Sequence, residues 1–140
     1  MYQVFNKTTG ITTFKEGNEP LDARYKNLSV KEFACNDGNE VVVYAEWVPM
    51  AFQLLRDVFG ALTVSSGFRT YTHNLSVGGA KTSRHLFADA IDILTPDGID
   101  VELFFKVAQA ILGYNHGYGI YDWGIHIDDR GERSTWDYRS

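Results

Sequence analysis

The sequence has little that would cross-link the chain covalently or place it in a membrane. Among its 140 residues there is one cysteine, and there are three prolines. Cys35 cannot form a disulfide within the chain, so the fold does not depend on an oxidising compartment. The longest apolar runs are a few residues, such as Val41–Val43, which is far too short for a membrane-spanning helix. Residues Met1–Lys7 lack the apolar stretch of a signal peptide, so we expect no export signal there.

Positive charge is also scarce. The chain has 13 Lys and Arg against 18 Asp and Glu, for a formal net charge of −5, and it has no dense basic cluster. This balance argues against a nucleic-acid partner and against an anionic membrane surface. The hydrophobic fraction of 44% and the aromatic fraction of 14% are typical of a globular protein, and they exclude a disordered or collagen-like chain.

Hydrophobic periodicity predicts both helices and strands. Apolar residues three and four apart, each series followed by a glycine, predict helices over residues 44–59 and 100–112. Short apolar or alternating runs predict strands over residues 61–65, 88–94, 118–121 and 124–128, the last two as separate strands or as one bent strand. Because strand and helix signals do not alternate strictly, we predict an α+β fold with a mostly antiparallel sheet rather than a doubly wound α/β fold.

The remaining segments are less regular. Residues 70–84 are polar and rich in glycine, which predicts a long loop with one helical turn. Residues 1–27 alternate loosely between polar and apolar, which predicts a hairpin or an extended arm packed on the rest of the chain. The length fits a single domain, with residues 28–140 as its main body.

Two predicted strands carry ionisable residues between isoleucines. Alternation places Asp92 on one face of its strand and the neighbouring isoleucines on the other. In the second strand, His126 and Asp128 share one face and the isoleucines share the other. If the two strands are neighbours, facing residues have Cβ atoms about 5 Å apart, close enough to share a metal ion. His85, seven residues before Asp92, could join the group. The same pattern is also compatible with polar residues on an exposed sheet face, so spacing alone leaves both interpretations open.

Three segments carry a resemblance to a known family. The segment SRHLFADAID, residues 83–92, resembles the SxHxxGxAxD motif of the M15 zinc D-Ala-D-Ala carboxypeptidases. The segments SGFRT, residues 66–70, and IHID, residues 125–128, resemble the SG[YF]R and H-x-D motifs of the same family. The resemblance extends over residues 28–136 and is to the short single-domain branch that is common in bacteria and their phages.

The resemblance implies a metal centre. Its ligands would be His85, Asp92 and His126, holding Zn²⁺ with a fourth position open, as in catalytic zinc sites. The resemblance also implies that Arg69 stabilises the negative charge that develops on the scissile carbonyl oxygen. Ser83 matches a position that contacts the substrate peptide in the family, but a hydroxyl that caps the turn before His85 would explain this serine equally well.

The sequence departs from the family pattern at two positions. Ala88 replaces the usual glycine, a change that a negative φ would allow. Trp123 stands three residues before the second histidine, where many members have the acidic general base. We expect a bulge at the following glycine to bring Asp122 to the metal as the base, with His116 and Asp128 as the other candidates.

The function implied by the resemblance is zinc-dependent hydrolysis of amide bonds next to D-amino acids in peptidoglycan stem peptides, by a D,D-carboxypeptidase or an endopeptidase. The implied fold is the one shared by these peptidases and the Hedgehog signalling domain. The missing acid supports a second hypothesis, a catalytically inactive zinc-binding module that binds the cell wall or serves as a structural unit. We expect a monomer. With no export signal visible, the localisation stays open between a phage lysis or virion protein and a bacterial protein exported by another route.

Overall fold

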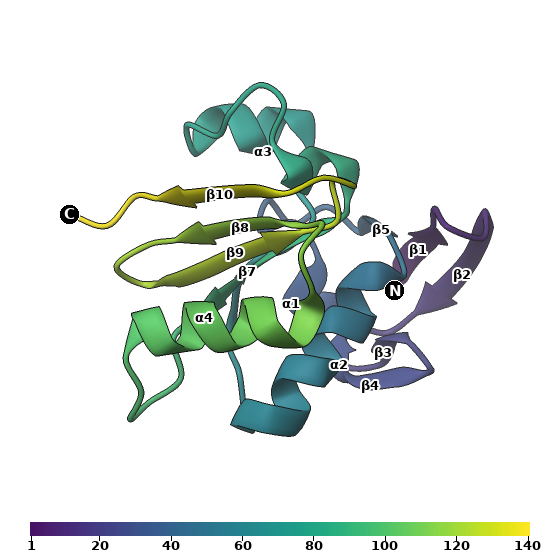
Figure 1. Ribbon diagram of the computed structural model, residues 1–140. Coiled ribbons are helices and arrows are strands. Elements are labelled where there is room, and N and C mark those ends of the chain that lie inside the picture. Colours follow the sequence, from purple (N-terminus) through teal and green to yellow (C-terminus); the bar gives the residue numbers. More distant parts are fainter.

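A five-stranded sheet forms the centre of the computed structural model, which describes residues 1–140 (Figure 1). Its strand order is β10-β8-β9-β7-β6, and every pair is antiparallel except β10 with β8. The strands are β6 (Val64–Ser66), β7 (Ala90–Leu94), β8 (Gly117–Ile120), β9 (Gly124–Asp128) and β10 (Ser134–Asp137). The α+β class and the mostly antiparallel sheet are therefore confirmed.

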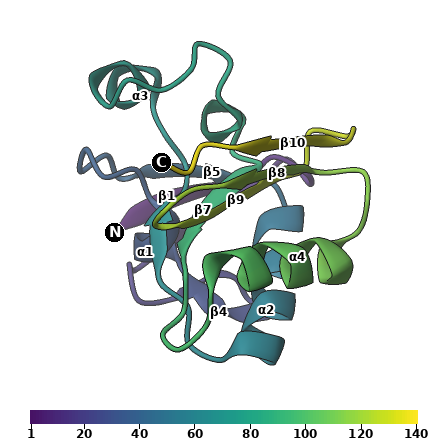
Figure 2. The same cartoon turned by 60° about the vertical axis from the view of Figure 1, so that its left-hand side comes forward.

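Two long helices cover one face of this sheet. Helix α4 (Val101–Leu112) contacts β8 and β9, and helix α2 (Trp47–Phe59) packs beside α4. Buried residues of both helices form one hydrophobic core with the isoleucines of β7 and β9. The short helix α3 (Tyr71–Ser76) lies on the opposite side of the sheet from α4, as both views show (Figures 1 and 2). The 3₁₀ helix η1 (Arg84–Phe87) directly precedes β7. The sheet therefore has one face in the core and one face free to form a site.

The N-terminal part forms two smaller sheets and a short helix. Strands β1 (Tyr2–Asn6) and β2 (Ile11–Lys15) form an antiparallel hairpin, and β1 also pairs in parallel with β5 (Val41–Tyr44). Strands β3 (Pro20–Asp22) and β4 (Tyr25–Ser29) form a second hairpin that leads into helix α1 (Val30–Phe33). The Lys7 ammonium group donates to the Phe87 carbonyl, so the first hairpin also contacts the end of η1.

Local sequence signals explain where the two long helices end. Pro49 lies in the first turn of α2, where its missing N–H leaves no hydrogen bond unmade. Gly60 follows α2 with a φ of 79°, and Gly113 follows α4 with a φ of 102°. The Asp100 carboxylate caps α4 by accepting from the Glu102 amide.

Several predicted boundaries were wrong. The first long helix does not begin at residue 44, because Val41–Tyr44 is the strand β5 that pairs with β1. The predicted strand over residues 88–94 begins at Ala90, because η1 and a left-handed turn precede it. The last segment forms two strands rather than one bent strand, and β10 was not predicted. None of the helices combines the length and the apolar character that crossing a membrane requires.

Candidate metal centre

The register of β7 and β9 places two ionisable side chains directly opposite each other. Asp92 pairs with His126 in the antiparallel ladder, while Ile91 pairs with Ile127 on the core side. Both Asp92 and His126 are buried, with 7% and 6% of their surface exposed. The alternation seen in the sequence thus produces a core on one face of these strands and a polar cluster on the other.

His85 joins this cluster from η1. The Ser83 hydroxyl accepts from the His85 amide at the start of η1, and the turn directs the imidazole toward the sheet. The His85 Nδ1 lies 2.7 Å from the carbonyl oxygen of Gly67, just after β6. Its Nε2 lies 3.1 Å from Asp92 Oδ1. A backbone carbonyl therefore orients this imidazole, with one nitrogen toward the polar cluster.

His126 is oriented in the same way by a carboxylate. Its Nδ1 lies 2.8 Å from Asp92 Oδ1, and its Nε2 lies 2.7 Å from Asp128 Oδ2. Asp128 is completely buried and also accepts from Nε and Nη2 of Arg130, at 2.9 and 2.7 Å. These bonds hold the pKa of Asp128 well below its usual range, although burial opposes the shift. Gly117 is required beside this group, because a Cβ there would collide with the Asp128 carboxylate.

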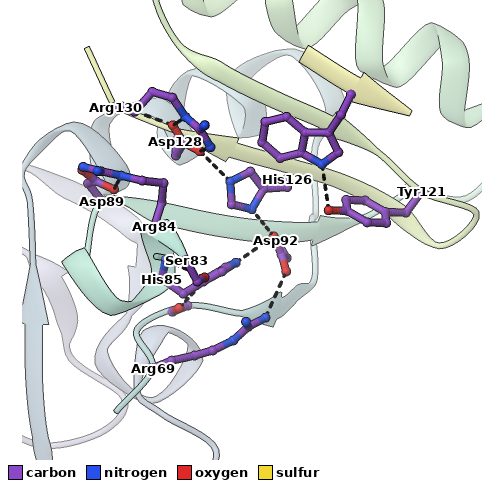
Figure 3. A network of polar contacts seen from close by, with 12 residues as sticks. Arg69, Ser83, Arg84, His85, Asp89, Asp92, Tyr121, His126, Asp128 and Arg130 are labelled. Carbon is purple, nitrogen blue, oxygen red and sulfur yellow. Dashed lines mark hydrogen bonds and ion pairs between the residues drawn. The ribbon is translucent and has the colours of Figure 1, made fainter. Parts of the chain in front are cut away.

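The three side chains fit a metal ion. One ligand atom from each of His85, Asp92 and His126 lies within 4.8 Å of the others (Figure 3). If each histidine donates its outer N–H, to the Gly67 carbonyl or to Asp128, both inner nitrogens present lone pairs to the Asp92 carboxylate. Lone pairs this close to a carboxylate oxygen repel unless a cation or a proton lies between them. Two imidazoles and one carboxylate are a ligand set typical of catalytic zinc, with outer partners that orient the histidines.

The charge state of the cluster is consistent with this fit. Although burial favours the neutral ring, hydrogen bonds to Asp128 and Asp92 raise the pKa of His126. Although burial favours the protonated acid, hydrogen bonds from His126 and His85 lower the pKa of Asp92. Without a metal, His126 therefore holds its proton to a higher pH than a free imidazole does, beside the Asp92 carboxylate. A divalent cation bound to the inner nitrogens would displace that proton.

Arg69 lies beside the cluster. Its Nη2 is 3.7 Å from Asp92 Oδ2, on the side away from the histidines. Its Nε donates to Ser66 Oγ and its Nη1 to Asn74 Oδ1, both at 3.1 Å. Only 16% of the Arg69 side chain is exposed. The guanidinium group is thus fixed beside the Asp92 carboxylate at the edge of the cluster.

A cleft of about 650 Å³ opens over this cluster. Ser83 lines the cleft, and its hydroxyl also caps the turn before His85, so both interpretations of this serine agree with its position. Two arginines and four aromatic residues also line the cleft: Arg84, Tyr121, Trp123, Arg130, Trp136 and Tyr138. Arg130 could have been found, because it extends the i, i+2 series of His126 and Asp128.

Asp122 is not brought to the cluster. Strand β9 begins at Gly124 and pairs with Leu94 without a bulge, so nothing turns residue 122 inward. The exposed Asp122 carboxylate instead accepts from the amide and the hydroxyl of Ser140. The expected bulge is therefore absent, and the cleft contains no acidic side chain besides Asp92.

The other two candidates for the general base, His116 and Asp128, also lie outside the open cleft. The His116 ring stacks on Trp47 at 4.8 Å and does not line the cleft. Its Nδ1 is 3.1 Å from Asp129 Oδ1, without hydrogen-bond alignment. Asp128 is buried behind His126 and is engaged by Arg130. Neither residue faces the open cleft.

Ala88 has a conformation that the sequence analysis did not expect. Its φ is 63°, in the left-handed region, and it is the only residue other than glycine with a positive φ. The sequence analysis expected alanine to replace the family's glycine at a negative φ, and this expectation was wrong. The methyl group is tolerated at a steric cost, and its backbone still bonds to His85 and Ala45.

Comparison with known proteins agrees with this geometry. A family model described as Peptidase M15 matches residues 26–128, most of the chain. A zinc D-Ala-D-Ala carboxypeptidase from Streptomyces albus G is 40% identical over 68 residues, which is 47% of this chain. The match spans only 24% of that relative's length. No solved structure matches the chain.

Proposed function

This chain belongs to the peptidase M15 family, and on that basis we propose that it is a zinc-dependent peptidase. Its substrates are amide bonds next to D-amino acids in peptidoglycan stem peptides. The observation that carries the proposal is the convergence of His85, Asp92 and His126 at the floor of an open cleft. The name of the Streptomyces relative supports both the metal and the kind of bond.

The chain's own residues have separable roles in this proposal. His85, Asp92 and His126 would hold the zinc ion, which would supply Lewis-acid polarisation of the scissile carbonyl and activation of water. The Gly67 carbonyl and the Asp128 carboxylate keep the two imidazoles in place. Because Arg69 is already immobilised, its guanidinium stabilises the developing oxyanion with little reorganisation.

One observation favours a second function. A hydrolase of this kind needs a group that accepts a proton from the attacking water. Since Asp122 lies outside the cleft and Asp92 is occupied as a ligand, no carboxylate is free for this role. The alternative is a zinc-binding module of the same fold that binds the cell wall or serves as a structural unit, without turnover.

Digestion of muropeptides by the zinc-loaded protein, followed by mass spectrometry, tests the proposal. Loss of one D-Ala residue, or cleavage of cross-linked dimers, is expected from the native protein and not from His126→Ala. If the protein retains about one zinc per chain and binds the fragments but releases no product, the module is correct and the peptidase is not.

The proposed substrate also constrains where the protein acts. Peptidoglycan lies outside the cytoplasmic membrane, so the protein must reach the wall as a phage lysis or virion component or through export. Hydrolysis of stem-peptide bonds in purified cell walls by the added protein would be compatible with each of these routes.

A further inference from the structure

The cleft has two unlike ends on either side of the metal centre. Along β7 and β9, Asp92 and His126 lie in the middle, and the Ala90–Asp128 pair lies two residues away at one end. At that end, Arg84 and Arg130 line the cleft, whereas Tyr121 lines the opposite end (Figure 3). A bound peptide that crosses the metal therefore meets Arg84 and Arg130 on one side, where the Arg130 guanidinium lies 5.0 Å from the Trp136 ring, and Tyr121 on the other.

The two arginines are held rigidly by buried acids. Arg130 donates through Nε and Nη2 to Asp128, and Arg84 donates through the same two atoms to Asp89. Asp128 and Asp89 have 0% and 4% of their surface exposed. The arginine side chains themselves are 25% and 27% exposed. In both, Nη1 makes no hydrogen bond within the protein, so each presents oriented, unused N–H groups.

The charge balance of the cleft favours an anion at this end. Three buried carboxylates, of Asp89, Asp92 and Asp128, are balanced by three arginines, of which Arg69 is the third. With neutral imidazoles this group has no net charge. A bound divalent cation leaves an excess of two positive charges, and a carboxylate on the ligand would offset part of it.

The position of the arginines favours a carboxylate close to the metal. The Ala90–Asp128 pair, whose acid binds Arg130, lies two residues of strand, or about 7 Å, from Asp92 and His126. In a peptide whose leaving group is a single residue, the terminal carboxyl carbon is three bonds, or less than about 4 Å, from the scissile carbonyl carbon. Such a leaving group keeps its carboxylate near this end of the cleft, whereas each further residue carries it about 3.5 Å further along.

We propose that Arg84 and Arg130 bind the free α-carboxylate of the substrate's last residue. This inference rests on the proposed function and narrows it, because an internal amide bond has no such carboxylate. The two arginines are specificity residues that favour removal of a single C-terminal residue over cleavage of cross-links.

The test compares two non-hydrolysable ligands with zinc-loaded protein. Both are N-acetyl-L-Lys-D-Ala-D-Ala in which the scissile amide is reduced to CH₂–NH, one ending in a carboxylate and the other in a carboxamide. Dissociation constants come from calorimetry or from the fluorescence of the cleft tryptophans. Two charge-assisted hydrogen bonds predict that the carboxylate binds at least about 10-fold more tightly.

Variants locate the preference. Arg84→Gln and Arg130→Gln keep a donor for the buried acids, and each is expected to lower the carboxylate preference to about 3-fold or less. Arg133→Gln is the matched control, because Arg133 contacts Gln109 and Tyr114 outside the cleft, and it should keep the full preference. The proposal is wrong if the native protein binds both ligands equally or binds neither, or if the preference survives in both cleft variants. Carboxylate preference without hydrolysis of the parent peptide would instead support this inference and refute the peptidase.

Discussion

Replacing Asp92 by asparagine should remove most of the zinc affinity without removing the fold. The Asp92 carboxylate lies 2.8 Å from His126 Nδ1 and 3.1 Å from His85 Nε2, at the point where the three ligand atoms meet. Asparagine has the same shape and can still hydrogen-bond to both imidazoles, but it lacks the negative charge. The variant thus isolates the contribution of the carboxylate as a ligand.

The size of the loss follows from typical zinc energetics. Structural zinc sites are worth about 10–16 kcal/mol over four ligands, or roughly 3 kcal/mol per ligand. Loss of one ligand therefore weakens binding by about 100-fold or more. At a zinc concentration 1,000 times the native dissociation constant, the native protein gains about 4 kcal/mol of stability and Asp92→Asn gains about 1.4 kcal/mol. For a chain of 140 residues this is a rise in Tm of about 14 °C against about 5 °C.

The assay is thermal unfolding with and without zinc, together with competition against a chromophoric chelator. Asp89→Asn is the matched control, because Asp89 is equally buried and only three residues away, yet it bonds to Arg84 rather than to the histidines. It should keep zinc affinity within about 3-fold of the native value. Our assignment of the ligands is refuted if Asp92→Asn keeps the full zinc-dependent rise in Tm, or if both variants lose it equally.

Four further outcomes are expected. Although burial favours the neutral ring, carboxylate hydrogen bonds raise the pKa of His126 above its ordinary 6.5. The stability that this shift adds to the metal-free protein is complete below pH 6.5 and is lost as the pH rises through the raised pKa. The Tm in EDTA should therefore fall from pH 6 to 9, and a Tm that does not change with pH would contradict the argument. Zinc-loaded protein should show the opposite slope from pH 5 to 7, because the ligand imidazoles must be neutral. Ala88→Gly relieves a left-handed φ of 63° and should raise the free energy of unfolding in urea by about 0.5–1 kcal/mol; a loss of stability would show that the turn is not strained. Gly119→Ala places a Cβ against the indole of Trp136, which donates to Tyr121 at 2.8 Å, so peptide affinity should fall at unchanged zinc content in a calorimetric titration.

The central strands, and the face on which Asp92 and His126 lie, were predictable because local alternation determines them. Ile91 and Ile93 can be buried on the core face only if Asp92 faces the other way, and the same holds for His126 between its isoleucines. Once the two strands are neighbours, the register brings the polar residues together. The sequence does not show that they are neighbours, and for this the family resemblance supplied the missing information.

Features that depend on distant partners could not be predicted in this way. The strand Val41–Tyr44 exists because β1 pairs with it, and no periodicity within four residues distinguishes it from the start of a helix. The position of Asp122 depends on a tight turn and on the C-terminal Ser140 that binds its carboxylate. The left-handed turn at Ala88 is imposed by the path from η1 into β7, against the preference of the residue itself.

The arrangement of charges in the cleft ties metal binding to ligand binding. When both imidazoles are neutral, Arg84, Arg69 and Arg130 balance the charge of the three buried carboxylates, which lowers the cost of burying the polar face of the sheet. A zinc ion then adds charge that the protein does not compensate. Whatever anion binds beside it is stabilised by that excess, and by linkage the anion strengthens zinc binding by the same factor. The same three arginines thus serve folding when the site is empty and recognition when it is loaded, so their removal should affect ligand binding most in the zinc-loaded state.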